Sequence, residues 1–242
     1  MKKGFTLAEV LITLGIIGVV AALAAPALNN STQKAKVGPA LSKFINTMET
    51  AHEHIIVDNQ ADSLSTVTEN DVDTYITELT KYVKGIKESK TLGEFSPTPS
   101  NFQGEETDGA PIYETNGKSW PVFTFADGSA MTLSMYARGS EYKGGTYKGN
   151  VASVWFDING FDKKPNRAGK DEFRFYFDDS GSVYPDGGKT KMKLIEMTTG
   201  NKNALNWETG NNRSLCNKDK VTTGVYCGAS VVDNGFKVIY KY

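Results

Sequence analysis

Cysteine and histidine are scarce in this chain of 242 residues, which contains two of each. Two histidines are too few for the common metal hydrolases, and the sequence holds neither an HExxH segment nor a phosphate-binding glycine loop. No set of nucleophile, base and orienting residue can be assembled from its motifs. The net charge of −1 provides no basic excess that would attract nucleic acid or an anionic surface. These shortages argue against an enzyme and against nucleic acid as a partner, and no resident cofactor is expected.

Charge is also missing from a long stretch near the N-terminus. Residues 10–25 carry no charge and a single polar side chain, Thr13. With residues 5–7 in front, the apolar stretch reaches about 20 residues, which is enough for a helix that crosses a bilayer. The basic pair at residues 2–3 predicts a cytoplasmic N-terminus, so everything after Pro26 is expected on the far side of the membrane.

A cleaved signal peptide has a similar layout and is the alternative to a retained membrane helix. The small residues at 22–24 would form its cleavage site. Two residues argue against this alternative. Glu9 places a costly carboxylate inside the apolar region, and Pro26 lies within two residues of the cleavage point. The sequence therefore favours a helix that stays on the protein.

The order of residues in this segment is distinctive. A short basic leader ends in Gly4, Phe5 follows directly, an acid stands at Glu9, and an apolar run with Ile-Ile-Gly at 16–18 ends near Pro26. This order closely resembles the N-terminus of type IV pilins and of the pseudopilins of type II secretion systems. The resemblance is tight over residues 1–30 and extends only to the general layout beyond them.

The resemblance implies that the chain is a prepilin of the bacterial inner membrane, with its head in the periplasm or outside the cell. A membrane-embedded aspartyl prepilin peptidase would cut after Gly4, and the new amine on Phe5 would be methylated. An inner-membrane assembly platform would then join the chain to other pilin or pseudopilin subunits. The product would be either a type IV pilus or a type II secretion pseudopilus.

Glu9 has a specific role by the same resemblance, which is to neutralise the Phe5 amine of an adjacent subunit when the helices bundle. Physical reasoning supports that role independently. Burying an amine or a carboxylate alone costs free energy, and the cost is much reduced when the two form a close pair. Loss of either partner leaves the other as an uncompensated buried charge. The acid that is expensive in a lone membrane helix is therefore useful in a bundle.

The helical pattern continues beyond the membrane segment as an amphipathic helix over residues 29–57. Its apolar residues recur at steps of three and four, at Val37, Leu41, Phe44, Ile45, Met48, Ala51 and Ile55. His52 and His54 lie two positions apart, hence about 200° apart around a helix, so they are interpreted as solvated helix residues and not as metal ligands.

The predicted organisation is a leader at 1–4, a transmembrane and filament-core helix at 5–28, the amphipathic helix at 29–57 and a globular head at 58–242. The head is expected to begin with a helix over 69–85 and a long irregular connection at 89–117. Strands are predicted at 121–125, 130–136, 151–158 and 172–177, the first two joined by the turn at Asp127-Gly128. The predicted fold class is α+β, with a long N-terminal helical spine packed on an antiparallel sheet of three to five strands.

The segment between the last two predicted strands contains candidate calcium ligands. Asp157, Asn159 and Asp171 offer hard oxygen donors in a turn-rich loop. The resemblance adds some support, since some pseudopilins bind calcium in a C-terminal loop. Their spacing is not that of an EF-hand, however, and the basic residues of the same loop would oppose a cation. The favoured interpretation is a structural loop in which Asp and Asn cap turns.

Two further features of the head are a group of basic and aromatic residues and a pair of cysteines. A nucleic-acid patch is an alternative to the favoured interpretation of a solvated glycine-rich loop, and it would combine Lys163, Lys164, Arg167 and Lys170 with Tyr142, Lys143, Tyr147 and Lys148. Cys216 and Cys227 are expected to form a disulfide in an exported head, and the resemblance implies the same, because many pilins close a C-terminal loop in this way. Two free buried thiols are the alternative.

The predicted function is therefore that of a structural filament subunit. The rival from another class is a secreted or membrane-anchored binding module, for carbohydrate, calcium or DNA, that carries an ordinary signal sequence.

Overall fold

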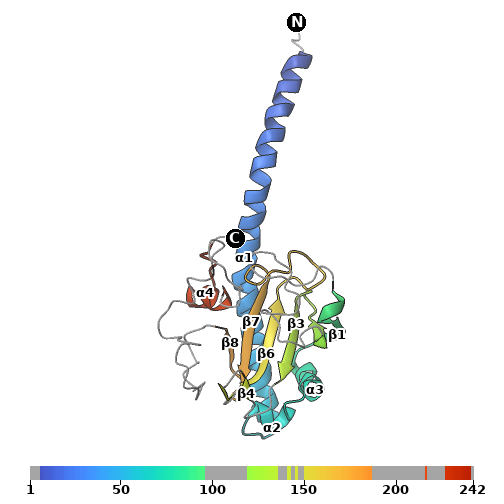
Figure 1. Cartoon of the computed structure of the whole chain (residues 1–242), viewed down its shortest axis with the longest axis vertical. Coiled ribbons are helices and arrows are strands. Elements are labelled where there is room, and N and C mark those ends of the chain that lie inside the picture. Colours follow the sequence, from blue (N-terminus) through green and yellow to red (C-terminus); the bar gives the residue numbers. More distant parts are fainter. Residues whose placement is uncertain are drawn as a thin grey trace.

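The computed structural model describes residues 6–95, 119–135, 141–142, 145–146, 150–186, 216 and 227–240. A helix of 52 residues, α1 (Leu7–Asp58), dominates it and spans about 78 Å. The first half of α1 projects alone, and the second half lies against a β-sheet, with the other helices at the margins of that sheet (Figure 1). The membrane helix and the amphipathic helix predicted from the sequence are thus two halves of one continuous helix.

A six-stranded sheet forms the centre of the head, in the order β1-β2-β3-β6-β7-β8. Every neighbouring pair in it is antiparallel. Its strands are β1 (Lys87–Thr91), β2 (Pro121–Thr124), β3 (Ala130–Met135), β6 (Asn150–Asp157), β7 (Glu172–Asp178) and β8 (Val183–Pro185). A separate two-stranded ribbon consists of β4 (Glu141–Tyr142) and β5 (Gly145–Thr146).

The sheet is larger than the three to five strands predicted. The four predicted strands are present as β2, β3, β6 and β7, each within one residue of its expected ends. Two edge strands, β1 and β8, are additional. Strand β1 has the sequence KESKT, which contains no apolar residue, and its side chains are mostly exposed. Because strand prediction relies on alternation between apolar and polar residues, this edge strand gave no signal. It overlaps the start of the segment predicted to be irregular, and residues 96–117 of that segment lie outside the described residues.

The short helices are α2 (Leu64–Thr68), α3 (Val72–Tyr82), the 3₁₀ turn η1 (Leu92–Glu94) and α4 (Cys227–Asp233). The helix predicted over 69–85 is α3, which is shorter at both ends. Glu69 and Asn70 have φ of +52° and +56°, so they cannot continue a right-handed helix. Asp71 caps α3 by accepting the N–H of Thr74 at 2.8 Å.

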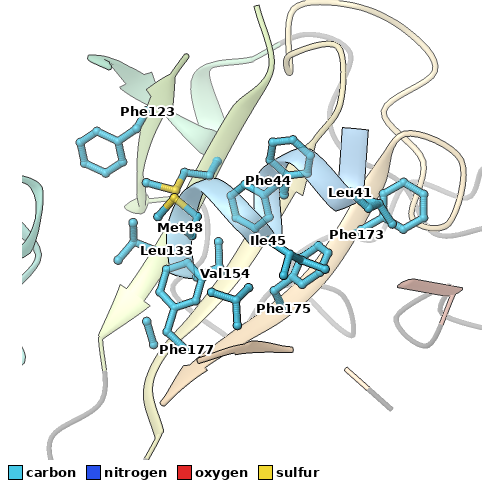
Figure 2. Packing of buried hydrophobic residues seen from close by; sticks show 14 of the residues in the cluster. Leu41, Phe44, Ile45, Met48, Phe123, Leu133, Val154, Phe173, Phe175 and Phe177 are labelled. Atoms are coloured by element: carbon cyan, nitrogen blue, oxygen red, sulfur yellow. The ribbon is translucent and has the colours of Figure 1, made fainter. Parts of the chain in front are cut away.

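The core lies between α1 and the inner face of the sheet. Figure 2 shows Leu41, Phe44, Ile45 and Met48 of α1 facing strand residues such as Leu133, Val154, Phe175 and Phe177. The ring of Phe44 stacks on that of Phe156 with 4.1 Å between centroids. All seven residues of the predicted apolar stripe of α1 are buried. Burial of each of the larger side chains among them stabilises the fold by about 1.5–3 kcal/mol. The structure confirms the α+β class and the packing of the spine on an antiparallel sheet.

Candidate functional site

The first half of α1 is an apolar surface with nothing of the head against it. The segment Leu7–Ala24 has a mean hydropathy of 2.4 and is entirely unburied. Leu7, Leu11 and Leu23 are between 62% and 81% exposed. Contiguous apolar area of this size marks a surface that another apolar phase or partner covers. Length and composition allow this helix to cross a membrane.

Glu9 lies in the first turn of this helix, where it forms a capping box with Thr6. Its carboxylate accepts the backbone N–H of Thr6 at 2.8 Å and the Thr6 hydroxyl at 2.9 Å. The Thr6 hydroxyl oxygen in turn accepts the N–H of Glu9 at 3.2 Å. The start of the helix therefore holds the carboxylate in a fixed position at the end of the apolar surface.

Thr6, the partner of Glu9, was not among the residues predicted for the site. Its signal was present, since Thr followed by an acid three residues later before an apolar run is the pattern of a capping box. The predicted processing residues Gly4 and Phe5 lie outside the described residues, so the structure adds nothing about them.

The interpretation of His52 as a solvated residue is wrong. His52 is fully buried beneath the β7–β8 turn. Its Nδ1 is 2.8 Å from the carbonyl oxygen of Gly181 and its Nε2 is 2.8 Å from the hydroxyl of Tyr75. A carbonyl only accepts, so Nδ1 carries the proton and the Tyr75 hydroxyl donates to Nε2. Gly181 has φ of +81°, and a Cβ there would stand 2.7 Å from the Cβ of His52, so glycine is needed at this approach.

His54 is exposed on α1, as predicted, and its ring stacks on Tyr82 with 5.3 Å between centroids. The two imidazoles therefore belong to different environments. Two positions on a helix that are about 200° apart face different surroundings, and in this head only the side of His52 is covered.

Two of the three candidate calcium residues, Asp157 and Asp171, accept turn N–H groups in the loop between β6 and β7, whereas the Asn159 amide donates to the carbonyl oxygens of Lys163 at 3.4 Å and Lys164 at 3.3 Å. One carboxylate oxygen of Asp157 accepts the N–H groups of Asn159 and Gly160, both at 2.8 Å. The carboxylate of Asp171 accepts the N–H groups of Asn166 at 3.0 Å and Arg167 at 2.7 Å. The favoured interpretation, in which acidic side chains cap turns, matches these contacts.

A calcium site does not follow from this geometry. Among the residues that the structure describes, no group of three or more His, Cys, Asp or Glu side chains is placed to hold a metal ion. Calcium binding by Asp157, Asn159 and Asp171 stays a prediction from residue types alone.

Asp157 and Asp171 are both buried, and their environment opposes ionisation. Burial and the nearby charge of Asp171 raise the pKa of Asp157 well above its usual range. Burial raises the pKa of Asp171 to about 6, despite its backbone hydrogen bonds. Two such carboxyls hold a proton more tightly in the folded head than in the unfolded chain. These two groups therefore contribute stability that is lost as the pH rises from about 4 to above 6.

We expect Asp157→Asn to raise the free energy of unfolding at pH 7 and to change it less at pH 4, where the pair is already protonated. An asparagine keeps an oxygen acceptor for the two turn N–H groups and removes one of the two buried titratable carboxyls. Urea unfolding of the full chain at both pH values measures this difference. Asp162→Asn, on an exposed position of the same loop, is the matched control, and equal effects of the two variants would contradict the explanation.

Cys216 and Cys227 form the predicted disulfide, with 5.2 Å between their Cα atoms. Both residues are buried, and Cys227 begins α4. Their sequence separation of 11 gives about 3 kcal/mol of stabilisation in the chain-entropy estimate. The side chains at 142–148 of the alternative nucleic-acid patch lie outside the described residues.

Comparison with known proteins gives three findings. The family model for the prokaryotic N-terminal methylation motif matches residues 1–25. Two curated relatives, each called fimbrial protein and each from Pseudomonas aeruginosa, are 30% identical to the chain over 118 residues, which is 49% of this chain and 70% of each relative. No solved structure matches the chain. Because the match covers more than two thirds of each fimbrial protein and the methylation motif opens the chain, this protein belongs to the type IV pilin family.

Proposed function

We propose that this pilin is a subunit of a surface pilus, made as a precursor that is cut after Gly4, methylated at Phe5 and polymerised through the apolar half of α1. The observation that carries the proposal is the unburied apolar segment Leu7–Ala24 with a charged residue, Glu9, in its first turn. A membrane covers this segment before assembly, and the helices of neighbouring subunits cover it afterwards. Both environments are apolar, so the exchange between them needs no change in the head.

The proposed route has an orientation and named classes of partner. The basic residues before the helix favour a cytoplasmic N-terminus, which places the head in the periplasm or outside the cell. A prepilin peptidase removes residues 1–4, and an inner-membrane assembly platform extracts the processed subunit and adds it to other copies or to related pilins.

A pilus is preferred to a type II secretion pseudopilus because of the relatives. The curated proteins that match the chain are fimbrial proteins. A pseudopilus shares the same N-terminal motif, so the motif alone does not separate the two filaments. The preference therefore rests on the match beyond the first 25 residues.

Processing tests the proposal directly. We expect mass spectrometry of the membrane fraction to find an N-terminal peptide that begins at methylated Phe5, and we expect Gly4→Ala to abolish it because the peptidase cuts at that bond. Gly18→Ala is the matched control, since a Cβ at Gly18 meets nothing within 4 Å in the subunit. A start near Ala25 in wild type and variant alike would favour the secreted binding module. An intact Met1 in wild type would instead indicate a permanently anchored protein.

A further inference from the structure

The point where α1 enters the head is well defined. Among the described side chains of α1, every one from Leu7 to Thr32 is exposed, Gln33 and Lys34 are half-buried, and Val37 is the first to be fully buried. The C-terminal tail, residues 234–240, ends beside this point (Figure 1). Two segments far apart in the sequence thus meet where the helix leaves the head.

The tail is an extended segment with one face on the head. Phe236, Val238 and Tyr240 are buried or half-buried, whereas Lys237 and Ile239 between them are exposed. Phe236 and Val238 pack against the same core cluster that contains Val37 of α1. The alternation shows that the tail is docked along one side and open to solvent along the other.

The contact between the tail and α1 requires a glycine. A Cβ at Gly38 would overlap the backbone carbonyl of Phe236, so neither a rotamer change nor a flexible side chain can relieve the collision. Glycine inside a helix is normally destabilising relative to alanine. Its presence where the backbone of Phe236 approaches the helix is accounted for by this close contact.

Two hydrogen bonds hold the end of the tail. The ammonium group of Lys34 donates to the carbonyl oxygen of Tyr240 at 2.7 Å. The hydroxyl of Tyr240 donates to the carbonyl oxygen of Gly169 at 2.6 Å, and the Tyr240 side chain is buried. The tail therefore bridges α1 to the loop between β6 and β7.

The turn that leads into the tail is strained. Asn234 caps α4 by donating to the carbonyl oxygen of Ser230 at 2.7 Å. Gly235 and Phe236 then take φ of +66° and +61°. A residue with a Cβ pays for that conformation, so the docked position of Phe236 must be held by contacts elsewhere.

From these contacts we infer that the C-terminal tail is a strap that closes over α1 at Lys34–Gly38 and sets how much of the helix stands free of the head. With the strap closed, the free segment ends at Thr32. With it open, the turn from Lys34 to Gly38 loses its cover on that side while the sheet contacts from Leu41 onward remain. Helix α4, which precedes the strap, is tethered at its first residue by the disulfide between Cys216 and Cys227.

Limited trypsin digestion of the full chain in detergent micelles tests the strap. Lys237 is exposed in the tail, and Lys34 lies beneath it, so cleavage at either requires opening of the tail. We expect Gly38→Ala to increase cleavage at both sites by about tenfold to a hundredfold, because overpacking shifts the closed strap towards the open state. Gly15→Ala is the matched helix control, since its Cβ meets nothing within 4 Å, and its cleavage rates should equal those of wild type.

Tyr240→Phe provides a second route that leaves the helix unchanged. Loss of the hydroxyl donor to Gly169 should raise cleavage at Lys237 and Lys34 by about fivefold, with the urea midpoint of the sheet unchanged. Unchanged cleavage in Tyr240→Phe would overturn the inference, even where Gly38→Ala fails to fold. It would also be overturned by faster cleavage at Lys237 alone, or by faster cleavage matched by an equal loss of stability of the whole head.

Discussion

Glu9→Ala is expected to abolish filament formation while the chain still inserts in the membrane and its head still folds. In the proposed bundle, Glu9 neutralises the methylated Phe5 amine of an adjacent subunit inside an apolar environment. Removing one partner of a buried ion pair leaves the other uncompensated, at a cost of about 3–5 kcal/mol for each contact. That cost recurs at every subunit of a filament. The measurement is electron microscopy of sheared surface filaments, with the membrane pool quantified in parallel.

The capping box separates two roles that Glu9 has in the subunit. Glu9→Gln keeps an oxygen that can accept the N–H of Thr6 but removes the charge, so we expect it to fail in assembly as alanine does. Thr6→Ala keeps the charge and removes the N-cap hydroxyl, which costs about 0.5–2 kcal/mol of helix stability, so assembly should weaken without being lost. Thr13→Ala is the control, since the Thr13 hydroxyl bonds only the carbonyl of Val10 within its own helix. Normal filaments from Glu9→Gln would show that the cap, and not the charge, is required.

The elements that could be predicted from sequence are those whose residues repeat with a clear period. The apolar stripe of α1 from Val37 to Ile55 recurs at helical steps, and β6 and β7 are rich in aromatic and β-branched residues, so both appear in the structure close to their expected ends. Strand β1 has no apolar residue, and it exists because β2 offers an edge to pair with. Pairing of this kind is a tertiary effect that no local pattern records.

The sites divide in a similar way. The segment from Gly4 to Glu9 is a continuous motif, whereas the contacts of His52 join residues separated in sequence by 23 and 129 positions. A histidine on a helix has the same local pattern whether the head covers it or not. The role of Gly38 was hidden for the same reason, because the backbone that excludes a side chain there belongs to Phe236.

Because His52 is buried, we expect it to make the head less stable in acid, and we expect one substitution of His52 to remove this effect. Burial lowers the pKa of His52 from 6.5 to about 4, against a smaller opposite effect of its bond to Gly181. Below pH 6.5 the unfolded chain therefore takes up a proton that the folded head refuses until about pH 4. Stability is lost through this interval and the loss is complete below it, at about 3 kcal/mol.

Carboxyl groups act in the opposite direction over the same pH range. Burial raises the pKa of Asp171 and of Asp186 to about 6, so these groups favour the folded head as the pH falls. The pH profile of the wild type is thus a sum of opposing effects and cannot by itself reveal the histidine. A difference between two variants of the same head can.

We therefore expect His52→Asn to be less stable than wild type at pH 7 and to regain about 3 kcal/mol relative to it by pH 4, measured by urea unfolding of the full chain with fluorescence from the buried Trp155. An asparagine amide can still donate to the carbonyl of Gly181 but does not titrate in this range. Tyr75→Phe is the matched control: it removes the hydroxyl at Nε2 but leaves the imidazole buried, so its stability should keep most of the acid dependence of the wild type. A difference between His52→Asn and wild type that is constant from pH 7 to pH 4 would mean that His52 is protonated as readily in the folded head as in the unfolded chain. We expect a difference that changes with pH, because only the neutral imidazole can accept from Tyr75 while it donates to Gly181. Protonation of His52 in acid should therefore open the contact between α1, α3 and the β7–β8 turn first.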